Sequence, residues 1–380
     1  MTIVDILLLA LLLGCVGAVA YPFALYPVVL TLLPRRCVTS LQADARSASL
    51  LFCAYNEGAA MPGKIANLAM LKTRHPDLQV LAFDDRSNDD TAQLLDARSD
   101  LLTLVSSEGR SGKAHGMKQL AALATGDVLI FTDANVALAP DAIDNLLAYY
   151  ADPQVGGVLG SLQYEGGEGS ATAAVGSLYW RIEEALKDRE SATGNVMGAD
   201  GSIFSIQREL YPDFPDTVLD DLTVSMAVVF AGKRLIKAKD VIAIEGLVSA
   251  RGDEYRRKVR IAARAWHTHR YLRPALRRMA RVDRFKYTSR KIVRWFGGVF
   301  IATGALAALA LLWRLWPDAL PFAVVGSAIL ALIGWRVRSG PIASVVDILL
   351  AYVATLQGIV RAMRGQVVAT WSPAKSRQDG

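Results

Sequence analysis

Cysteine and histidine are scarce in this sequence. Of 380 residues only three are cysteines, Cys15, Cys37 and Cys53, and they show neither a pairing nor a metal-binding spacing. This argues against a disulfide scaffold or a cysteine zinc site and suits a reducing compartment. Among the four histidines, His267 and His269 stand two positions apart in an expected helix, where side chains diverge. We interpret them as surface or interface residues.

Two familiar nucleotide-binding motifs are also missing. No Gly-x-Gly-x-x-Gly follows the first expected strand, which removes a dinucleotide-dependent dehydrogenase. The stretch from Gly109 to Ala114 is similar to a P-loop, but Ser107 stands at the first glycine position and Ala114 at the Ser/Thr position. The P-loop reading therefore fails.

Apolar residues are abundant, and positive charge is concentrated in one segment. The sequence is 52% hydrophobic with a mean hydropathy of +0.28, which points to membrane segments. The net charge is +6, yet residues 251–294 alone hold sixteen Lys or Arg against three acids. A basic stripe beside hydrophobic segments indicates a cytoplasmic membrane face and contact with anionic lipids before it indicates nucleic acid.

The apolar run Ile3–Leu33 is long enough for one tilted transmembrane helix that continues into the interface. A signal peptide is the weaker alternative, because the run is too long and its positive charge follows it, at Arg35 and Arg36. These arginines predict that the next domain is cytoplasmic.

Three further apolar segments lie at Phe296–Leu312, Leu320–Trp335 and Ile342–Val360. The first two are typical of a helical hairpin. The third contains Asp347 and Gln357 and precedes a basic tail, so a re-entrant or interfacial helix is an alternative to a further span.

Between these membrane segments, short apolar strands alternate with longer helices. Strands are expected at Leu50–Ala54, Gln79–Phe83, Leu101–Val105 and Val128–Phe131, and helices at about 59–73, 89–97, 112–124 and 140–150. This alternation predicts an α/β fold with a mostly parallel sheet flanked by helices. Each strand ends in a polar loop, and four such loops at one sheet edge favour a ligand site.

The strand Val128–Phe131 is followed by Asp133, Ala134 and Asn135. Taken alone, Asp and Asn after a strand are more often turn formers than metal ligands. Further on, Asp220 and Asp221 open an expected helix, where acids are also favoured by the helix dipole. Because neighbouring helical positions point about 100° apart, at most one of these two side chains should point directly into the expected ligand site at the sheet edge.

Six motifs together resemble those of the membrane-bound family 2 glycosyltransferases. They are Ala54-Tyr55-Asn56-Glu57, Asp84-Asp85-Arg86-Ser87-Asn88-Asp89-Asp90-Thr91, Gly112-Lys113-Ala114, Thr132-Asp133-Ala134-Asn135, Gly198-Ala199-Asp200-Gly201-Ser202 and Leu219-Asp220-Asp221-Leu222. None is specific alone, but their order and spacing match the family. The resemblance implies a GT-A nucleotide-sugar domain, a divalent metal (Mg²⁺ or Mn²⁺) and inversion at the anomeric carbon. Cellulose, hyaluronan and exopolysaccharide synthases are members.

The resemblance also assigns roles to individual residues. It implies that Glu57 and Asp85 hold the ribose and uracil of a UDP-sugar, that Lys113 lies near the nucleotide, and that Asp221 is the general base. Asp133 would bind the metal, with Asn135 as its partner. The full set of substrate-binding candidates is Asn56, Glu57, Asp85, Lys113, Asp133, Asp200, Gly201, Asp220, Arg257 and Arg260.

Two departures from the family pattern bear on activity. Asn135 replaces the usual second acid of the metal motif, which keeps an oxygen ligand but removes a charge. The Gln-x-x-Arg-Trp motif of the polysaccharide synthases is matched only by Arg257-Lys258-Val259-Arg260-Ile261. Arg260 keeps the diphosphate-facing role, whereas the missing Gln and Trp put processive polymerisation in doubt.

The sequence therefore predicts a multi-pass protein of the plasma (inner) membrane with a cytoplasmic GT-A domain. Its expected parts are a transmembrane helix at 1–34, the GT-A domain at 35–250, basic juxtamembrane helices at 251–294, and membrane segments with a basic tail at 295–380. The leading hypothesis is sugar transfer from a UDP-sugar to a lipid-linked or growing glycan, with export by a separate protein. The alternatives are transfer of a single sugar to a lipid such as ceramide or a polyprenyl phosphate, and a nucleotide-sensing subunit without turnover.

Overall fold

A computed structural model describes residues 1–36, 38, 46–165, 171–246, 251–337, 339–366 and 370. The end of the basic tail lies outside these described residues. The centre of the fold is one eight-stranded sheet in the order β3-β2-β1-β4-β7-β6-β8-β5. The strands are β1 (Ala48–Ala54), β2 (Gln79–Asp84), β3 (Thr103–Ser106), β4 (Val128–Thr132), β5 (Val136–Leu138), β6 (Val155–Glu165), β7 (Ile203–Gln207) and β8 (Arg234–Gly246).

The sheet is mixed, with a parallel half and a half that contains antiparallel pairs. β3, β2, β1 and β4 pair in parallel, which confirms the four expected strands and their βα alternation. β7 runs antiparallel to β4 and β6, while β8 runs parallel to β6 and antiparallel to β5. The carboxyl ends of β1, β2 and β4 therefore meet at one edge, beside the start of β7.

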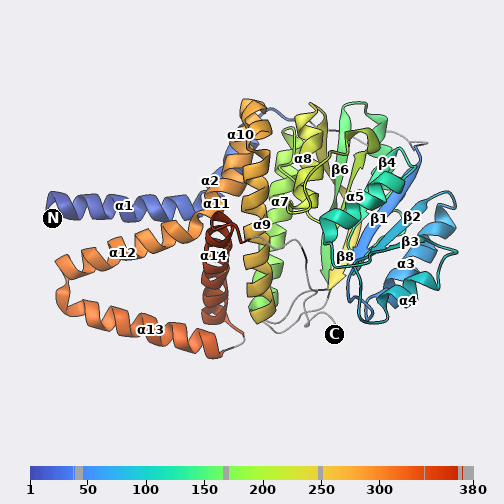
Figure 1. Ribbon diagram of the computed structural model, residues 1–380. Helices are drawn as coiled ribbons and strands as arrows, with labels where there is room; N and C mark the ends of the chain where they lie inside the picture. Colours follow the sequence, from blue (N-terminus) through green and yellow to red (C-terminus); the bar gives the residue numbers. More distant parts are fainter. Residues whose placement is uncertain are drawn as a thin grey trace.

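Helices cover both faces of the sheet (Figure 1). They are α3 (Met61–Arg74), α4 (Thr91–Asp96), α5 (Lys113–Leu123), α6 (Ala142–Ala148), α7 (Ala171–Ala192), α8 (Asp220–Phe230), α9 (Arg251–Arg278), α10 (Arg281–Tyr287) and α11 (Val293–Trp295), with short turns η1 (Tyr149–Ala151), η2 (Arg208–Leu210) and η3 (Thr288–Ile292). Because strand side chains alternate between faces, β1 sends Leu50 and Phe52 to a core shared with α3 and α6. Leu51 and Cys53 enter a second core with α5 and α8.

Four helices in the described part of the chain are long and apolar enough to cross a membrane: α1 (Ile3–Ala20), α12 (Gly297–Leu315), α13 (Leu320–Arg336, preceded by η4, Pro317–Ala319) and α14 (Pro341–Met363). The N-terminal run is not one continuous helix, because it turns after Ala20 and resumes as α2 (Leu25–Leu32). Figure 1 shows α1 beside α12, with α13 returning as the expected hairpin. Asp5 and Arg314 pair at 2.6 Å between α1 and α12.

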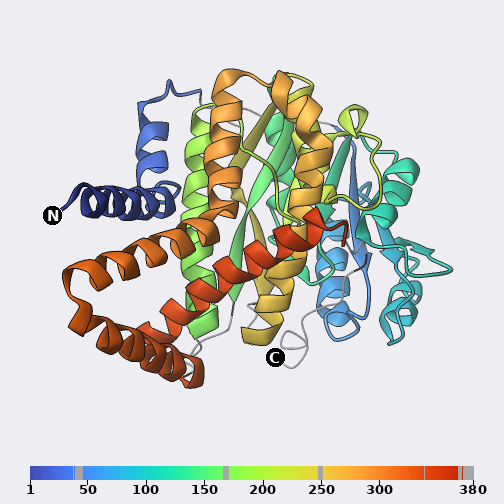
Figure 2. The same cartoon turned by 60° about the vertical axis from the view of Figure 1, so that its left-hand side comes forward.

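α14 differs from the other three candidate spans in direction and packing. It runs crosswise to α1 and α12 in Figure 1 and passes in front of α9 in Figure 2. A Cβ at Gly358 would lie 2.4 Å from the carbonyl oxygen of Val259, so the two helix backbones touch where glycine allows it. Such a helix suits a membrane surface better than a transmembrane path, which favours the interfacial alternative for this segment.

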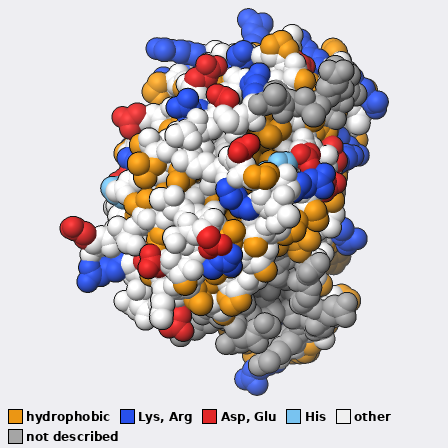
Figure 3. Space-filling model, turned by 90° about the vertical axis from the view of Figure 1, so that its right-hand side faces the viewer, with side chains coloured by type: hydrophobic (Ala, Val, Ile, Leu, Met, Phe, Trp, Pro, Cys, Tyr) orange, Lys and Arg blue, Asp and Glu red, His pale blue; other side chains and the backbone are white. Residues whose placement is uncertain are grey.

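The surface that faces away from the membrane helices has a different character. Figure 3 shows acidic and basic side chains scattered over it, without a broad region of one sign. The mixed charge suits contact with water rather than with anionic lipid.

A buried ionic cluster joins α2, α7 and η3. The Arg290 guanidinium is 2% exposed and lies 2.9 Å (Nε) from Glu183 Oε1 and 2.6 Å (Nη1) from Glu190 Oε2. The Tyr26 hydroxyl donates to Glu190 at 2.6 Å, and Arg294 pairs with Glu183 at 2.6 Å. The helical segment that leads to α12 is thereby fixed to the domain built around the eight-stranded sheet.

Arg290→Met should destabilise the protein by about 3–5 kcal/mol, because two buried carboxylates would lose their main partner. The thermal midpoint of the purified protein in detergent measures this. Arg98→Met is the matched control, since its ion pair with Asp100 is at the surface, where solvent screens the interaction and it contributes little to stability. Equal midpoints for the two variants would contradict the proposed role of the cluster.

Candidate active site

Lys113, at the first position of α5, lies at the centre of the sheet edge where the strands end. Its ammonium is 2.6 Å from Asp133 Oδ1, after β4, and 3.8 Å from Asp220 Oδ2, at the start of α8. A Cβ at Gly201 would come within 2.9 Å of both Lys113 Nζ and Asp133 Oδ2. Segments distant in the sequence therefore meet at one point, and a side chain at position 201 would displace the ends of the Lys113 and Asp133 side chains.

The charges around Lys113 favour its protonated form. Burial lowers the pKa of the Lys113 ammonium, but Asp133, Asp220 and Asp221 outweigh burial and raise it above its usual value. Asp133 is the most open acid of this group: its side chain is 36% exposed, against 6% for Asp220. The accessible side of the cluster is thus the side on which a diphosphate and a metal would bind.

Asp221 lies at the N-terminus of α8 and accepts a hydrogen bond from the Leu222 amide at 2.6 Å. Burial, followed by the neighbouring charge of Asp220, raises the pKa of Asp221 to about 6, while Lys113 and Arg264 oppose the rise. The negative charges of Asp220 and Asp221 both raise the pKa of the Lys113 ammonium. A carboxyl with a pKa this close to neutrality is a stronger base than an ordinary aspartate, yet is ionised at pH 7.

The turn after β4 offers oxygen ligands that suit a hard divalent cation. The Asn135 amide nitrogen donates to Glu245 Oε1 at 3.1 Å, so the side chain is oriented by a carboxylate of β8. Among the described residues, no three His, Cys, Asp or Glu side chains gather into a complete site. Mg²⁺ commonly takes one or two protein oxygens and completes its shell with substrate phosphates and water. Asp133 and Asn135 fit that type of site.

Lys64 of α3 contacts this turn through its side chain. The sequence indicated no role for Lys64, apart from its being a single charged residue on an otherwise apolar face of the helix. It is 3% exposed, and its Nζ donates to the carbonyl oxygens of Asp133 (3.1 Å) and Val136 (2.7 Å). Burial lowers the pKa of the Lys64 ammonium to about 7, against the opposing charge of Asp133. Lys64 therefore fixes the backbone at the first predicted metal ligand.

The loops after β1 and β2 build the predicted nucleoside side of the site. Asp85 is fully buried, and its carboxylate accepts from Arg110 Nε (3.0 Å) and from the amides of Ser111 (2.7 Å) and Gly112 (3.1 Å). The Arg110 guanidinium lies 3.2 Å from the centre of the Tyr55 ring. Asp85 thus holds the segment that leads to Lys113.

Asn56 and Glu57 connect the same two loops. Asn56 has a positive φ of 52°, and its Oδ1 accepts from the Asn88 amide at 2.8 Å. The Glu57 amide donates to the Thr91 hydroxyl at 2.9 Å. These bonds fix the mutual position of the two loops on which the Glu57 and Asp85 side chains stand.

Asp200 is engaged with α7. Its carboxylate pairs with Lys187, which is 2% exposed and also lies 2.8 Å from Glu184. Burial would raise the pKa of Asp200, but Lys187 outweighs burial and the pKa is lowered. Asp200 therefore anchors the loop that presents Gly201 to the Lys113 cluster.

The two arginines predicted to bind the donor, Arg257 and Arg260, lie on α9. Arg257 forms a two-bond pair with Glu254 on its own helix, at 2.8 and 3.1 Å, and the charge of Glu245, the partner of Asn135, also acts on it. Contact of either arginine with the donor stays a prediction. Arg264, which the sequence did not single out, is 3% exposed, donates to the Val218 carbonyl at 2.7 Å and acts on Asp221.

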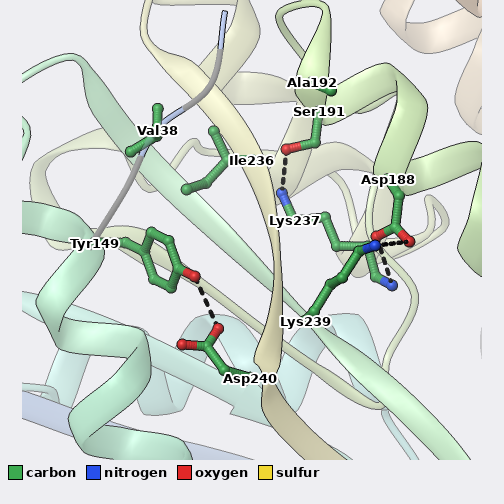
Figure 4. A pocket seen from close by; sticks show the side chains of 9 residues that line it. All are labelled: Val38, Tyr149, Asp188, Ser191, Ala192, Ile236, Lys237, Lys239 and Asp240. Atoms are coloured by element: carbon green, nitrogen blue, oxygen red, sulfur yellow. Dashed lines mark hydrogen bonds and ion pairs between the residues drawn. The ribbon is translucent and has the colours of Figure 1, made fainter.

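A cavity of about 370 Å³ between α7 and β8 lies apart from this cluster (Figure 4). None of its described lining residues belongs to the predicted site. Its polar groups are paired with each other: Tyr149 donates to Asp240 at 2.8 Å, and Lys237 and Lys239 lie 3.3 and 3.2 Å from Asp188.

Residues 49–214 match the family model described as Glycosyl transferase family 2. This segment, which is somewhat less than half of the chain, is similar to the family 2 glycosyltransferases. This confirms the part of the resemblance that concerns the family and the enzyme class. The membrane-bound polysaccharide-synthase subtype stays a prediction. Comparison with curated proteins yields no significant match.

Solved structures confirm the GT-A fold. The mannosyltransferase PcManGT from Pyrobaculum calidifontis, in complex with GDP-Man and Mn²⁺, is 22% identical with a TM-score of 0.73, and the match covers 94% of this chain and 99% of that chain. TarS 1–349 from S. aureus, in complex with UDP-GlcNAc, is 13% identical with a TM-score of 0.45, covering 84% of this chain and 92% of that chain. The match to PcManGT extends over nearly the whole chain, helices outside the family 2 domain included.

The pKa of about 6 for Asp221 predicts a pH dependence of the family 2 domain. Only the carboxylate accepts a proton, so turnover should fall as the pH drops through about 6 and level off above it. Asp220→Asn removes a neighbouring negative charge, lowers the pKa of Asp221 and should shift this acidic limb to lower pH. Release of nucleoside diphosphate across pH measures the limb. Asp216→Asn, a nearby acid that does not act on Asp221, should leave the limb in place; equal profiles for Asp220→Asn and the control would contradict the assignment.

Lys64→Met should weaken Mn²⁺ binding, because the Asp133 and Val136 carbonyls lose a buried donor at a cost of about 1–3 kcal/mol. Lys72→Met is a matched control on the same helix: Lys72 also donates to two carbonyls, those of Pro76 (2.8 Å) and Leu78 (2.9 Å), away from Asp133. Calorimetric titration with Mn²⁺ compares the two. If both variants bind Mn²⁺ equally well, Lys64 has no special role at the metal turn.

Proposed function

We propose that this protein is an inverting, metal-dependent glycosyltransferase that moves a sugar from a nucleotide donor to a lipid-linked or growing glycan at the cytoplasmic membrane face. The observation that carries the proposal is the Lys113 cluster, in which Asp133 and the Asp220–Asp221 pair face one ammonium at the strand ends. In this proposal Lys113 is the phosphate-binding cation, Asp133 is a metal ligand and Asp221 is the base, and the closeness of the three supports these roles.

In the proposed reaction, the carboxylate of Asp221 accepts the proton of the acceptor hydroxyl. The acceptor oxygen forms a bond to the anomeric carbon while the bond from that carbon to the diphosphate oxygen breaks, so the configuration inverts. Lys113 faces the diphosphate and stabilises its negative charge. Asp133 and Asn135 would hold Mg²⁺ or Mn²⁺, and the ion would supply Lewis-acid stabilisation of the negative charge on the leaving diphosphate. Asp220 keeps the pKa of the base high.

The donor is proposed to be a UDP-sugar, on the resemblance of the motifs around Glu57 and Asp85. The Pyrobaculum relative is described in complex with GDP-Man and Mn²⁺. A GDP-sugar is therefore the second donor class to test. The same relative supports a divalent metal for this chain.

The acceptor is proposed to be membrane-linked because the catalytic domain is tied directly to the membrane helices. Arg251, the first residue of α9, pairs with Asp347 of α14 and donates to the Trp335 carbonyl at the end of α13 at 2.9 Å. Asp347 also accepts from Thr172 of α7 at 3.0 Å. These contacts keep the starts of α7 and α9 beside the membrane segments.

Two alternatives follow from the same site. Without the Gln and Trp of the synthase motif, transfer of one sugar to ceramide or a polyprenyl phosphate is the enzymatic rival to chain growth. If the product is instead a growing glycan, we propose that a separate protein exports it. The non-enzymatic alternative is a membrane subunit that senses a nucleotide. The raised pKa of Asp221 argues against it, because shifted carboxyl pKa values are typical of catalytic sites and are not needed for nucleotide binding alone.

The test is to incubate membranes with labelled UDP-sugars and GDP-mannose in Mg²⁺, Mn²⁺ or EDTA. We expect a labelled membrane product that needs metal and disappears in Asp221→Asn, while nucleotide binding persists. Asp216→Asn is the control with the same loss of charge. Product length by mass spectrometry separates chain growth from single transfer. An intact protein that neither binds nor uses any of these donors would refute the proposal, and an unaffected Asp221→Asn would favour the sensor.

A further inference from the structure

A second cavity, of about 180 Å³, lies between the C-terminal part of α9 and α10. Figure 2 shows these helices as an antiparallel hairpin, joined at the top of the view. The cavity is lined by His269, Arg273, Leu276, Arg277, Met279, Arg284, Tyr287, Thr288 and Ile292. A water molecule needs about 15 Å³ of such space, so a polyatomic group fits.

The cavity carries concentrated positive charge. Arg273 and Arg277 stand one turn apart on α9, and Arg284 faces them from α10. None of the described lining residues is acidic, and none of these three arginines forms an ion pair within the described part of the chain. The nearest acid in sequence, Asp283, is engaged with Asn195 at 3.0 Å. Among the residues that the structure describes, the three guanidinium groups therefore have no counter-ion, and Arg284 donates only to the Arg277 carbonyl at 3.4 Å.

The inner wall is aromatic and apolar. The His269 ring stacks on Tyr287 with centres 5.8 Å apart, and the two side chains hydrogen-bond at 3.2 Å. Behind it, Trp266 lies 5.6 Å from His269, and its buried indole N–H has no hydrogen-bond partner among the described residues. Leu276, Met279 and Ile292 complete the wall. This combination suits a ligand with a charged head and an apolar body.

The position of the cavity favours a lipid over a soluble anion. α10 continues through η3 and α11 directly into α12, a candidate membrane span, and the last lining residue, Ile292, precedes α12 by five positions. Basic pockets between membrane-proximal helices bind anionic headgroups, and the planar guanidinium pairs with phosphate through two hydrogen bonds. The catalytic residues are held by another part of α9, where Arg264 and Thr268 bind Val218 and Leu219.

We propose that this cavity binds the phosphate group of an anionic phospholipid headgroup. Arg273, Arg277 and Arg284 supply the charge, and the apolar wall contacts the glycerol and upper acyl region. The site is separate from the donor site and does not depend on the reaction proposed above.

The test uses the full chain, purified in neutral detergent and titrated with phosphatidylglycerol, while native mass spectrometry follows bound lipid. Arg273→Gln combined with Arg277→Gln removes two charges from the cavity. Arg278→Gln combined with Arg281→Gln removes two charges from exposed neighbours outside it. Thermal midpoints without lipid check that both variants fold. Inorganic phosphate and phosphatidylcholine are the comparison ligands.

We expect saturable phosphatidylglycerol binding by the original protein and by the Arg278/Arg281 variant, and at least tenfold weaker binding by the Arg273/Arg277 variant. Phosphatidylcholine and inorganic phosphate should bind at least tenfold more weakly than phosphatidylglycerol. Equal loss in both double variants would show diffuse charge attraction and overturn the site. Unchanged binding by the Arg273/Arg277 variant would also overturn it, and so would inorganic phosphate binding as tightly as the lipid.

Discussion

The catalytic end of this molecule depends on a single ammonium group that compensates several carboxylates. Asp133, Asp220 and Asp221 come from the loop after β4 and from the start of α8, and all three act on Lys113. Gathering like charges in a partly buried space is unfavourable unless an opposite charge lies among them. Without Lys113, the loop after β4 and the start of α8 would repel each other. The ion cluster therefore joins the predicted metal turn to the predicted base.

Much of this arrangement follows from local sequence patterns. The runs Ala48–Ala54 and Val128–Thr132 are buried along their whole length, which gives continuous apolar stretches bounded by polar turns. Helical segments α12 and α13 are equally clear, since length and apolar composition define them. The convergence of Asp85, Asp133 and Lys113 follows because parallel strands have their carboxyl ends at the same edge.

What could not be predicted is which distant side chains support the site. Lys64 bonds to the Asp133 carbonyl, 69 positions away, and Asn135 pairs with Glu245, 110 positions away. No helical or strand periodicity encodes such partners, because they are set by how layers pack after the elements form. The pairing of Arg257 with Glu254, one turn away on the same helix, was not predicted from the sequence either.

The long helix α9 connects the catalytic and membrane parts in three ways. Near its start it packs on α14, where Gly358 meets Val259. In the middle, Arg264 and Thr268 hold the backbone of Val218 and Leu219, directly before the Asp220–Asp221 pair. Its end lines the basic cavity. One helix of 28 residues makes all three contacts. Because a helix is a rigid element, α9 fixes the distance between α14 and the segment that carries Asp221. Under the proposed function, an acceptor linked to the membrane could then reach Asp221 without any movement of the catalytic domain.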